Sequence, residues 1–135
     1  MKILVIDAQG GGLGKQLIQG IRSSLGDVHI TAVGTNTAAA TAMLKAGADE
    51  AATGENSVVV ACRKADVIMG PIGIVIADDM IGEITPKMAM AVAQADAKRI
   101  FIPFNNCDNY IAGVSDKNTS ALIEDAIEKL KKCVF

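Results

Sequence analysis

The first fifteen residues constrain the fold more than any other part of the chain. An apolar run, Lys2–Asp7, leads directly into the glycine-rich segment Ala8–Lys15, and apolar residues at helical spacing follow. A buried parallel strand, a glycine turn and a helix N-terminus in this order place backbone N–H groups where they can bind a phosphate. The segment therefore predicts a ligand of the nucleotide type, without saying which nucleotide or whether a reaction follows.

The rest of the chain alternates between strand-like and helix-like segments, without linkers or low-complexity stretches. Strands are expected at residues 2–7, 28–34, 50–53, 66–70 and 99–104. Helix start signals follow at Thr35 or Asn36, at Gly54, at Thr85-Pro86, and at Asn118 or Thr119. Strands joined by helices through right-handed crossovers predict a three-layer, doubly wound Rossmann-like α/β domain over residues 1–135. The expected strand order is 3-2-1-4-5, with 2-1-3-4-5 as the alternative.

Composition limits the partners. A chain of 135 residues suits one domain, and its net charge of −2 disfavours binding to nucleic acid or to an anionic membrane surface. The first apolar run is interrupted at Asp7, so no signal peptide is expected and the protein is predicted to be cytoplasmic. Cys62, Cys107 and Cys133 are too widely spaced for a disulfide framework or a zinc site, which predicts reduced thiols.

In a doubly wound sheet, the ligand binds outside the carboxyl ends of the strands, beside the first strand. The turns at this edge are rich in small and polar residues, which suits a polar site on an apolar scaffold. The predicted binding residues for the nucleotide come from these turns: Gly10, Gly11, Gly12, Leu13, Gly14, Lys15, Thr35, Asn36, Gly70, Pro71, Gly73 and Asn105.

A Walker A loop is a poor match to the glycine turn. That loop needs a Ser or Thr after its Gly-Lys pair, whereas Gly14-Lys15 is followed by Gln16. Gln9 also stands where the leading glycine belongs. The hydroxyl that binds magnesium in such loops is therefore missing, which argues against an ATPase of the Walker A type.

The segment Ala8–Lys15 more closely resembles the glycine turn of short-chain dehydrogenases, with Gly12 and Gly14 in the positions of its last two glycines. The resemblance covers about the first thirty residues and implies NAD(P) or another nucleotide as cofactor. The end of the second strand carries neither the acidic residue nor the arginine that would distinguish NAD from NADP. The family's catalytic Tyr-x-x-x-Lys is absent, because Val114 stands four residues after Tyr110, the single tyrosine.

Candidates for chemistry are few. Asp78 and Asp79, with Glu83 nearby, form a carboxylate cluster that could act as a base or hold a divalent cation, although solvated loop charges are the simpler explanation. Cys107 could be a reactive thiol, or an incidental residue of a polar turn. His29 is expected to be structural, because it begins the second strand at the edge opposite the ligand. No metal site is predicted.

The segment of residues 71–95 has more apolar surface than one side of a small sheet can cover. It contains the stretch Ile72–Ile81 and a helix that is apolar nearly all round. This pattern predicts a homodimer or larger assembly through residues 71–95.

Several runs together resemble a family of short bacterial proteins that is known as a domain of unknown function. They are Ala32–Asn36, Met43–Asp49, Ala52–Asn56 and Gly70–Ala77, and the similarity spans nearly the whole chain. The resemblance implies a small, stand-alone bacterial protein and no catalytic residue. Three functions stay open: a regulatory or non-catalytic nucleotide-binding module, a small enzyme acting on a nucleotide or phosphorylated metabolite, and a ligand-free homo-oligomeric interaction module.

Overall fold

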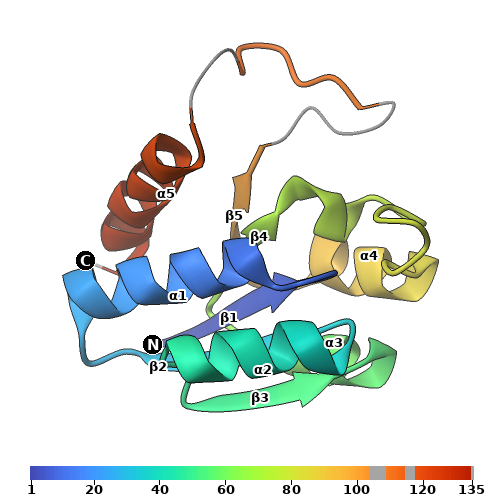
Figure 1. Ribbon diagram of the computed structural model, residues 1–135, viewed down its shortest axis with the longest axis horizontal. Helices are drawn as coiled ribbons and strands as arrows, with labels where there is room; N and C mark the ends of the chain where they lie inside the picture. The colour runs from blue at the N-terminus through green and yellow to red at the C-terminus, as the bar shows by residue number, and fades with distance from the viewer. Residues whose placement is uncertain (104–108, 115–117, 135) are drawn as a thin grey trace.

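The computed structural model describes residues 1–103, 109–114 and 118–134 (Figure 1). Strands and helices alternate along the described chain in the order β1 (Lys2–Asp7), α1 (Gly12–Leu25), β2 (His29–Gly34), α2 (Thr37–Ala46), β3 (Glu50–Thr53), α3 (Glu55–Lys64), β4 (Val67–Pro71), the 3-10 helix η1 (Ile72–Val75), α4 (Pro86–Gln94), β5 (Lys98–Ile102) and α5 (Thr119–Val134).

The strands form one parallel sheet in the order β3-β2-β1-β4-β5, which confirms the first of the two predicted orders. Helices α1, α2 and α5 cover one face, where Ile3, Val5 and Met69 belong to the buried core. Helices α3 and α4 cover the other face, where Leu4 and Ile6 are buried (Figure 1). Strand β1 lies at the centre and contributes to both cores, because successive side chains of a strand point to opposite faces.

Local sequence signals set the start of three helices. The side chain of Asn36 accepts a hydrogen bond from the Ala39 N–H and caps α2, and Thr85 caps α4 in the same way through the Met88 N–H. The side chain of Asn118 accepts from the Ala121 N–H at the start of α5. Each cap satisfies an N–H group that the helix itself leaves without a partner.

Some predicted boundaries are shifted. Strand β4 begins at Val67 and includes Pro71, because an end position of a strand does not require the N–H that proline lacks. The apolar stretch of residues 72–81, for which no regular element is predicted, forms η1 and a series of turns. Within the described residues, no helix is both long and apolar enough to cross a membrane.

Candidate functional site

The glycine turn connects β1 to α1 at the carboxyl edge of the sheet. Gly11 is the N-cap residue of α1 in the left-handed conformation, with φ of 75°, and no side chain caps the helix from this position. A Cβ atom on Gly11 would lie 2.8 Å from the Ala39 Cα, so only glycine fits here. The N–H groups of Gly10 and Gly12 make no hydrogen bond to any described residue. The turn therefore offers free donors at the positive end of a helix.

Asp7 supports this turn from inside the protein. Its side chain is buried, and its two oxygens accept hydrogen bonds from the Ala8 N–H at 2.8 Å and the Gly14 N–H at 2.7 Å. Burial raises the pKa of Asp7, and the hydrogen bonds from Gly14 and Ala8 oppose that shift. Asp7 thus satisfies the third N–H of α1 and leaves the first, that of Gly12, available.

A pocket of about 210 Å³ lies beside the turn. One wall consists of residues 7–13, and the other of Pro71, Ile72 and Gly73 with Asp79 and Met80. These walls follow β1 and β4, the two neighbouring strands from which the chain continues in opposite directions across the sheet. This is the position at which doubly wound proteins bind ligands.

Glu83 closes the other side of the turn. Its Oε1 atom accepts hydrogen bonds from the Gln9 N–H at 2.9 Å, the Thr35 hydroxyl at 2.6 Å and the Asn36 side-chain amide at 2.9 Å. The bond from Thr35, followed by that from Gln9, lowers the pKa of Glu83. A single carboxylate therefore holds the ends of β1 and β2 and the segment before α4 together.

The segment that carries Glu83 is folded by its own backbone. The Asp78 N–H donates to the Ile84 carbonyl at 2.7 Å, and the Ile84 N–H donates to the Asp79 carbonyl at 3.2 Å. Asp78, Met80 and Ile81 all have positive φ values, of 67°, 55° and 58°. Such values are unusual for side chains of this size, so the surrounding contacts must hold the segment in place.

The structure brings together some of the predicted binding residues and separates others. Residues 10–13, Pro71 and Gly73 line the pocket. Lys15 lines a different hollow between α1 and α2. Thr35 and Asn36 bind Glu83. Two further glycines lie in packed surroundings: Gly14 against Met43 and Asp7, and Gly70 against β1.

Asp79 is the described catalytic candidate that lines the pocket, and Asp78 does not. Asn105 and Cys107 lie outside the described residues. Within the described part of the chain, no three His, Cys, Asp or Glu side chains are placed to hold a metal ion, so Asp78, Asp79 and Glu83 do not form the cation site considered above.

The structure also adds residues and contacts that the sequence pattern did not assign to this site. Gln9, Ile72 and Met80 line the pocket, and Glu83 bonds to Thr35 across 48 positions of sequence. The positive φ of Gln9, 52°, follows from the tight turn, and no sequence signal identifies Ile72 or Met80 as site residues. Glu83 is part of the carboxylate cluster considered above, and its bonds to Gln9, Thr35 and Asn36 are what the structure adds.

The predicted interface at residues 71–95 is only partly apolar at the surface. Helix α4 buries Met88, Ala89 and Val92 on one side and also carries apolar residues on its exposed side. Ile81 is 97% exposed and Met90 is 57% exposed. Self-association through this segment stays a prediction.

The sequence matches, over residues 2–135, the family described as Domain of unknown function (DUF3842). The chain belongs to the DUF3842 family. This confirms the predicted membership of a family of unknown function. No curated protein was found to match this DUF3842 sequence.

Two solved structures resemble the DUF3842 protein at low sequence identity. The dodecameric FMN-dependent Ubix-like decarboxylase from Escherichia coli O157:H7 is 18% identical, with a TM-score of 0.47, and the match covers 98% of this chain and 76% of that one. AibC is 17% identical, with a TM-score of 0.52, and the match covers 97% of this chain and 41% of AibC. The likeness to AibC is one of fold, and the DUF3842 chain spans less than half of its length.

Replacing Glu83 with glutamine is expected to lower the free energy of unfolding at neutral pH by about 0.5–1 kcal/mol, because hydrogen bonds to a partly exposed charge are lost. The hydrogen bonds lower the pKa of Glu83 below its ordinary 4.5, so its contribution is present above pH 4.5 and is lost as the pH falls through the folded-state pKa. Urea unfolding of the wild type and the variant, from neutral to acidic pH, measures how the difference in their free energies of unfolding changes with pH.

Glu124→Gln, the same change on the exposed side of α5, controls for the loss of one negative charge. A difference between wild type and Glu83→Gln that grows as the pH falls would contradict the prediction.

Proposed function

We propose that this DUF3842 protein binds a nucleotide-type small molecule, with its phosphate at the N-terminus of α1. The observation that carries the proposal is the pocket between the ends of β1 and β4, one wall of which offers the free N–H groups of Gly10 and Gly12. Aligned N–H groups and the helix dipole both favour an anion at this position. The first turn of α1 contains no acidic residue, and the Asp7 carboxylate takes the Gly14 N–H while leaving that of Gly12 for a phosphate.

The opposite wall suits the sugar of the ligand. Asp79 lines it, and a carboxylate is a good acceptor for ribose hydroxyl groups. A Cβ atom on Gly73 would overlap the Asp79 carboxylate, so the glycine at this position allows Asp79 to approach the end of β4. Asp79 would repel a second phosphate, which favours one phosphate group and its ribose as the enclosed part.

The size of the pocket agrees with a partly enclosed ligand. Its volume of about 210 Å³ is below the range of roughly 300–1,000 Å³ that encloses typical small ligands. The base or flavin ring would therefore extend past the rim, beside the exposed residues of the 76–84 segment. NAD(P) stays among the candidate ligands, because the glycine turn resembles that of short-chain dehydrogenases.

The experiment is a thermal-shift panel of AMP, GMP, FMN, NAD⁺ and NADP⁺, followed by calorimetric titration of any ligand that raises the melting temperature. A ligand that binds only the native state and is present at one hundred times its Kd stabilises by about 2.7 kcal/mol, or about 10 °C for a domain of this size. If none of these compounds gives a saturable shift, the proposal is wrong.

Gly12→Asp is expected to weaken nucleotide binding by at least about tenfold, because the new carboxylate stands at the helix N-terminus and repels a phosphate. No heavy atom lies within 4 Å of a Cβ atom built on Gly12, and its φ is not positive, so the variant should fold with unchanged stability. Gly12→Ala is the matched control, since it adds the Cβ atom without the charge. Equal affinity of the two variants would exclude a phosphate at this position.

A further inference from the structure

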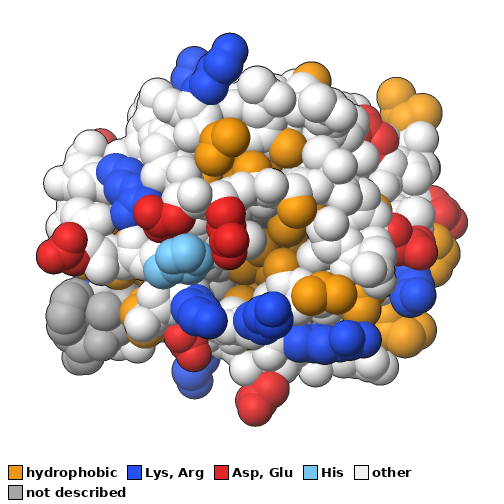
Figure 2. Space-filling view, turned by 90° about the horizontal axis from the view of Figure 1, so that it is seen from below, with side chains coloured by type: hydrophobic (Ala, Val, Ile, Leu, Met, Phe, Trp, Pro, Cys, Tyr) orange, Lys and Arg blue, Asp and Glu red, His pale blue; other side chains and the backbone are white. Residues whose placement is uncertain are grey.

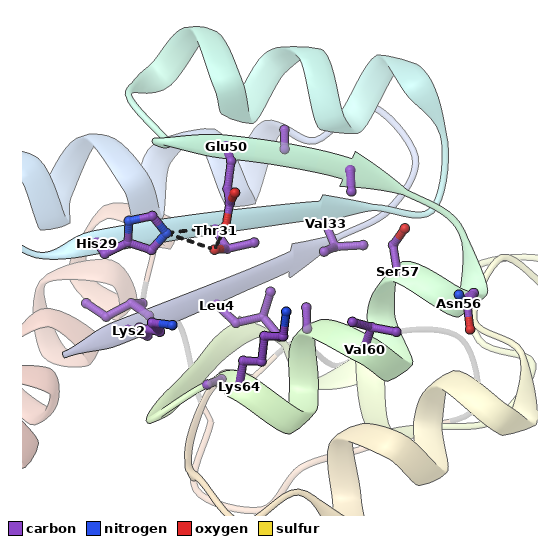
Figure 3. A pocket seen from close by; sticks show the side chains of 15 residues that line it. Lys2, Leu4, His29, Thr31, Val33, Glu50, Asn56, Ser57, Val60 and Lys64 are labelled. Carbon is purple, nitrogen blue, oxygen red and sulfur yellow. Dashed lines mark hydrogen bonds and ion pairs between the residues drawn. The ribbon is translucent and has the colours of Figure 1, made fainter.

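A second and larger pocket lies on the α3 side of the sheet. Its volume is about 340 Å³, and it shares no residue with the pocket beside the glycine turn. It is lined by the first residues of β1, by β2, by β3 and by one side of α3 (Figure 3). Figure 2 shows this face of the molecule, with hydrophobic side chains inside a hollow and charged side chains around it.

Small side chains leave this pocket open. Helix α3 lines the pocket with the small side chains of Ser57 and Ala61, and the edge strand β3 contributes Ala51 and Ala52. Among the described elements, α3 is the helix that packs on β2 and β3 from this face, while α4 packs against α3 and η1. The floor is apolar, since Leu4 and Val33 lie beneath the opening and Val60 borders it (Figure 3). The pocket is therefore an apolar trough between α3 and the edge of the sheet.

The acidic group at one end of the trough already has partners. The Glu50 Oε1 atom accepts a hydrogen bond from the Thr31 hydroxyl at 2.9 Å and lies 3.3 Å from the His29 Nε2 (Figure 3). The bonds from Thr31 and His29 lower the pKa of Glu50. Asp49, on the other side of the His29 ring, forms an ion pair with Arg22 at 2.7 Å.

Two ammonium groups beside the trough have no directly bonded partner. Lys2 and Lys64 both line it, and neither forms an ion pair or a side-chain hydrogen bond with any described residue. Lys64 acts on Glu50 only through the attraction of its charge, so its N–H groups stay available to a ligand. At the other end, Asn56 presents a side-chain amide. Asn56 and Lys64 are eight residues apart on α3, so the two polar ends are separated by about 12 Å along the helix axis.

We infer that this trough binds a small organic anion, a monocarboxylate with an elongated apolar body, whose carboxylate meets Lys2 and Lys64. The apolar floor removes the body of the ligand from water, and the unpaired ammonium groups determine the sign of its charge. A volume near the lower limit for ligand pockets limits the body to about the size of one aromatic ring and a short chain. The site is independent of the nucleotide site proposed above.

The test is an NMR titration of the whole protein with phenylbutyrate, compared with its neutral amide, phenylbutyramide. Phenylbutyrate is expected to shift the amide signals of Thr31, Ala52, Val60 and Lys64 saturably, and to leave those of Gly10 and Gly12 unchanged. The neutral amide is expected to bind about fivefold more weakly, because it lacks the attraction of the two ammonium groups. Equal affinities, or no saturable shift at millimolar concentration, would overturn the inference.

Two variants and one control complete the experiment. Lys64→Gln is expected to weaken phenylbutyrate binding by a few-fold and to leave phenylbutyramide binding unchanged. Lys132→Gln, on the exposed side of α5, removes the same charge away from the trough and is expected to change neither. Ala52→Trp fills the trough from exposed β3 and is expected to abolish binding of both compounds.

Self-association is the alternative occupant. If sedimentation shows a dimer and the amide signals of the trough change with protein concentration and not with phenylbutyrate, a second copy covers the trough and the inference is wrong. Nucleotide binding is detected through the amide signals of Gly10 and Gly12, and phenylbutyrate binding through those of the trough. Absence of binding at one site is therefore distinguishable from absence of binding at the other.

Discussion

Replacing Asp7 with alanine is expected to lower the free energy of unfolding by about 2–3 kcal/mol at neutral pH. The variant leaves the Ala8 and Gly14 N–H groups without their acceptors in a buried region, and each orphaned donor costs about 1–3 kcal/mol. Relief from burying a carboxylate offsets part of that cost. Urea unfolding followed by circular dichroism measures the change.

The pH dependence of this effect has a defined sign. Burial raises the pKa of Asp7 above 3.8, so the folded state binds this proton more readily than the unfolded chain. The contribution of Asp7 to stability is therefore largest at low pH and decreases as the pH rises through the folded-state pKa. The difference between wild type and Asp7→Ala should shrink in the same direction, opposite to the trend expected for Glu83→Gln.

Asp66→Ala is the matched control. Asp66 also accepts a backbone N–H, that of Lys2 at 2.8 Å, but in an exposed position where water replaces the lost acceptor. Its replacement should cost less than about 1 kcal/mol. If Asp7→Ala costs no more than Asp66→Ala, Asp7 does not organise the glycine turn.

Replacing Gly70 with alanine is expected to lower the free energy of unfolding by about 3 kcal/mol. A Cβ atom at this position would overlap the Ile6 carbonyl oxygen and lie 3.1 Å from the Ile74 Cδ1. The first of these neighbours is backbone of the central strand, so relief requires β1 and β4 to move apart. Overpacking in a rigid core costs 1–3 kcal/mol, and more where the backbone must shift. The midpoint of urea unfolding measures this cost.

Gly10→Ala is the control for Gly70→Ala. No heavy atom lies within 4 Å of a Cβ atom built on Gly10, and its φ is not positive, so the variant should unfold within about 0.5 kcal/mol of wild type. If Gly70→Ala is insoluble while Gly10→Ala folds normally, the same steric explanation holds. An unchanged unfolding midpoint for Gly70→Ala would show that β1 and β4 can separate at no cost.

The sheet and its helices could be predicted because their signals are local. Alternation of apolar strands with amphipathic helices gives the doubly wound fold and its strand order. Asn36, Thr85 and Asn118 cap helices that begin within three residues of them.

The parts of the site that could not be predicted depend on contacts between distant segments. Glu83 bonds to Gln9, Thr35 and Asn36 across 47–74 positions of sequence, and these bonds depend on the path of a segment in which three residues other than glycine have positive φ values. Lys15 was expected beside the ligand, but the rotation of α1 about its axis places it in the hollow toward α2. Such a rotation is decided by which side of the helix packs on the sheet.

The sequence by itself therefore determined the fold, and it predicted the carboxyl edge, with the glycine turn at its centre, as the place for a ligand. Strand and helix periodicity carry this information within short stretches of chain. Only the tertiary structure decided which donors stay free, because Asp7 takes the Gly14 N–H and leaves those of Gly10 and Gly12. Only the tertiary structure also revealed the trough beside α3, since Lys2 and Lys64 both line it through packing and not through sequence proximity.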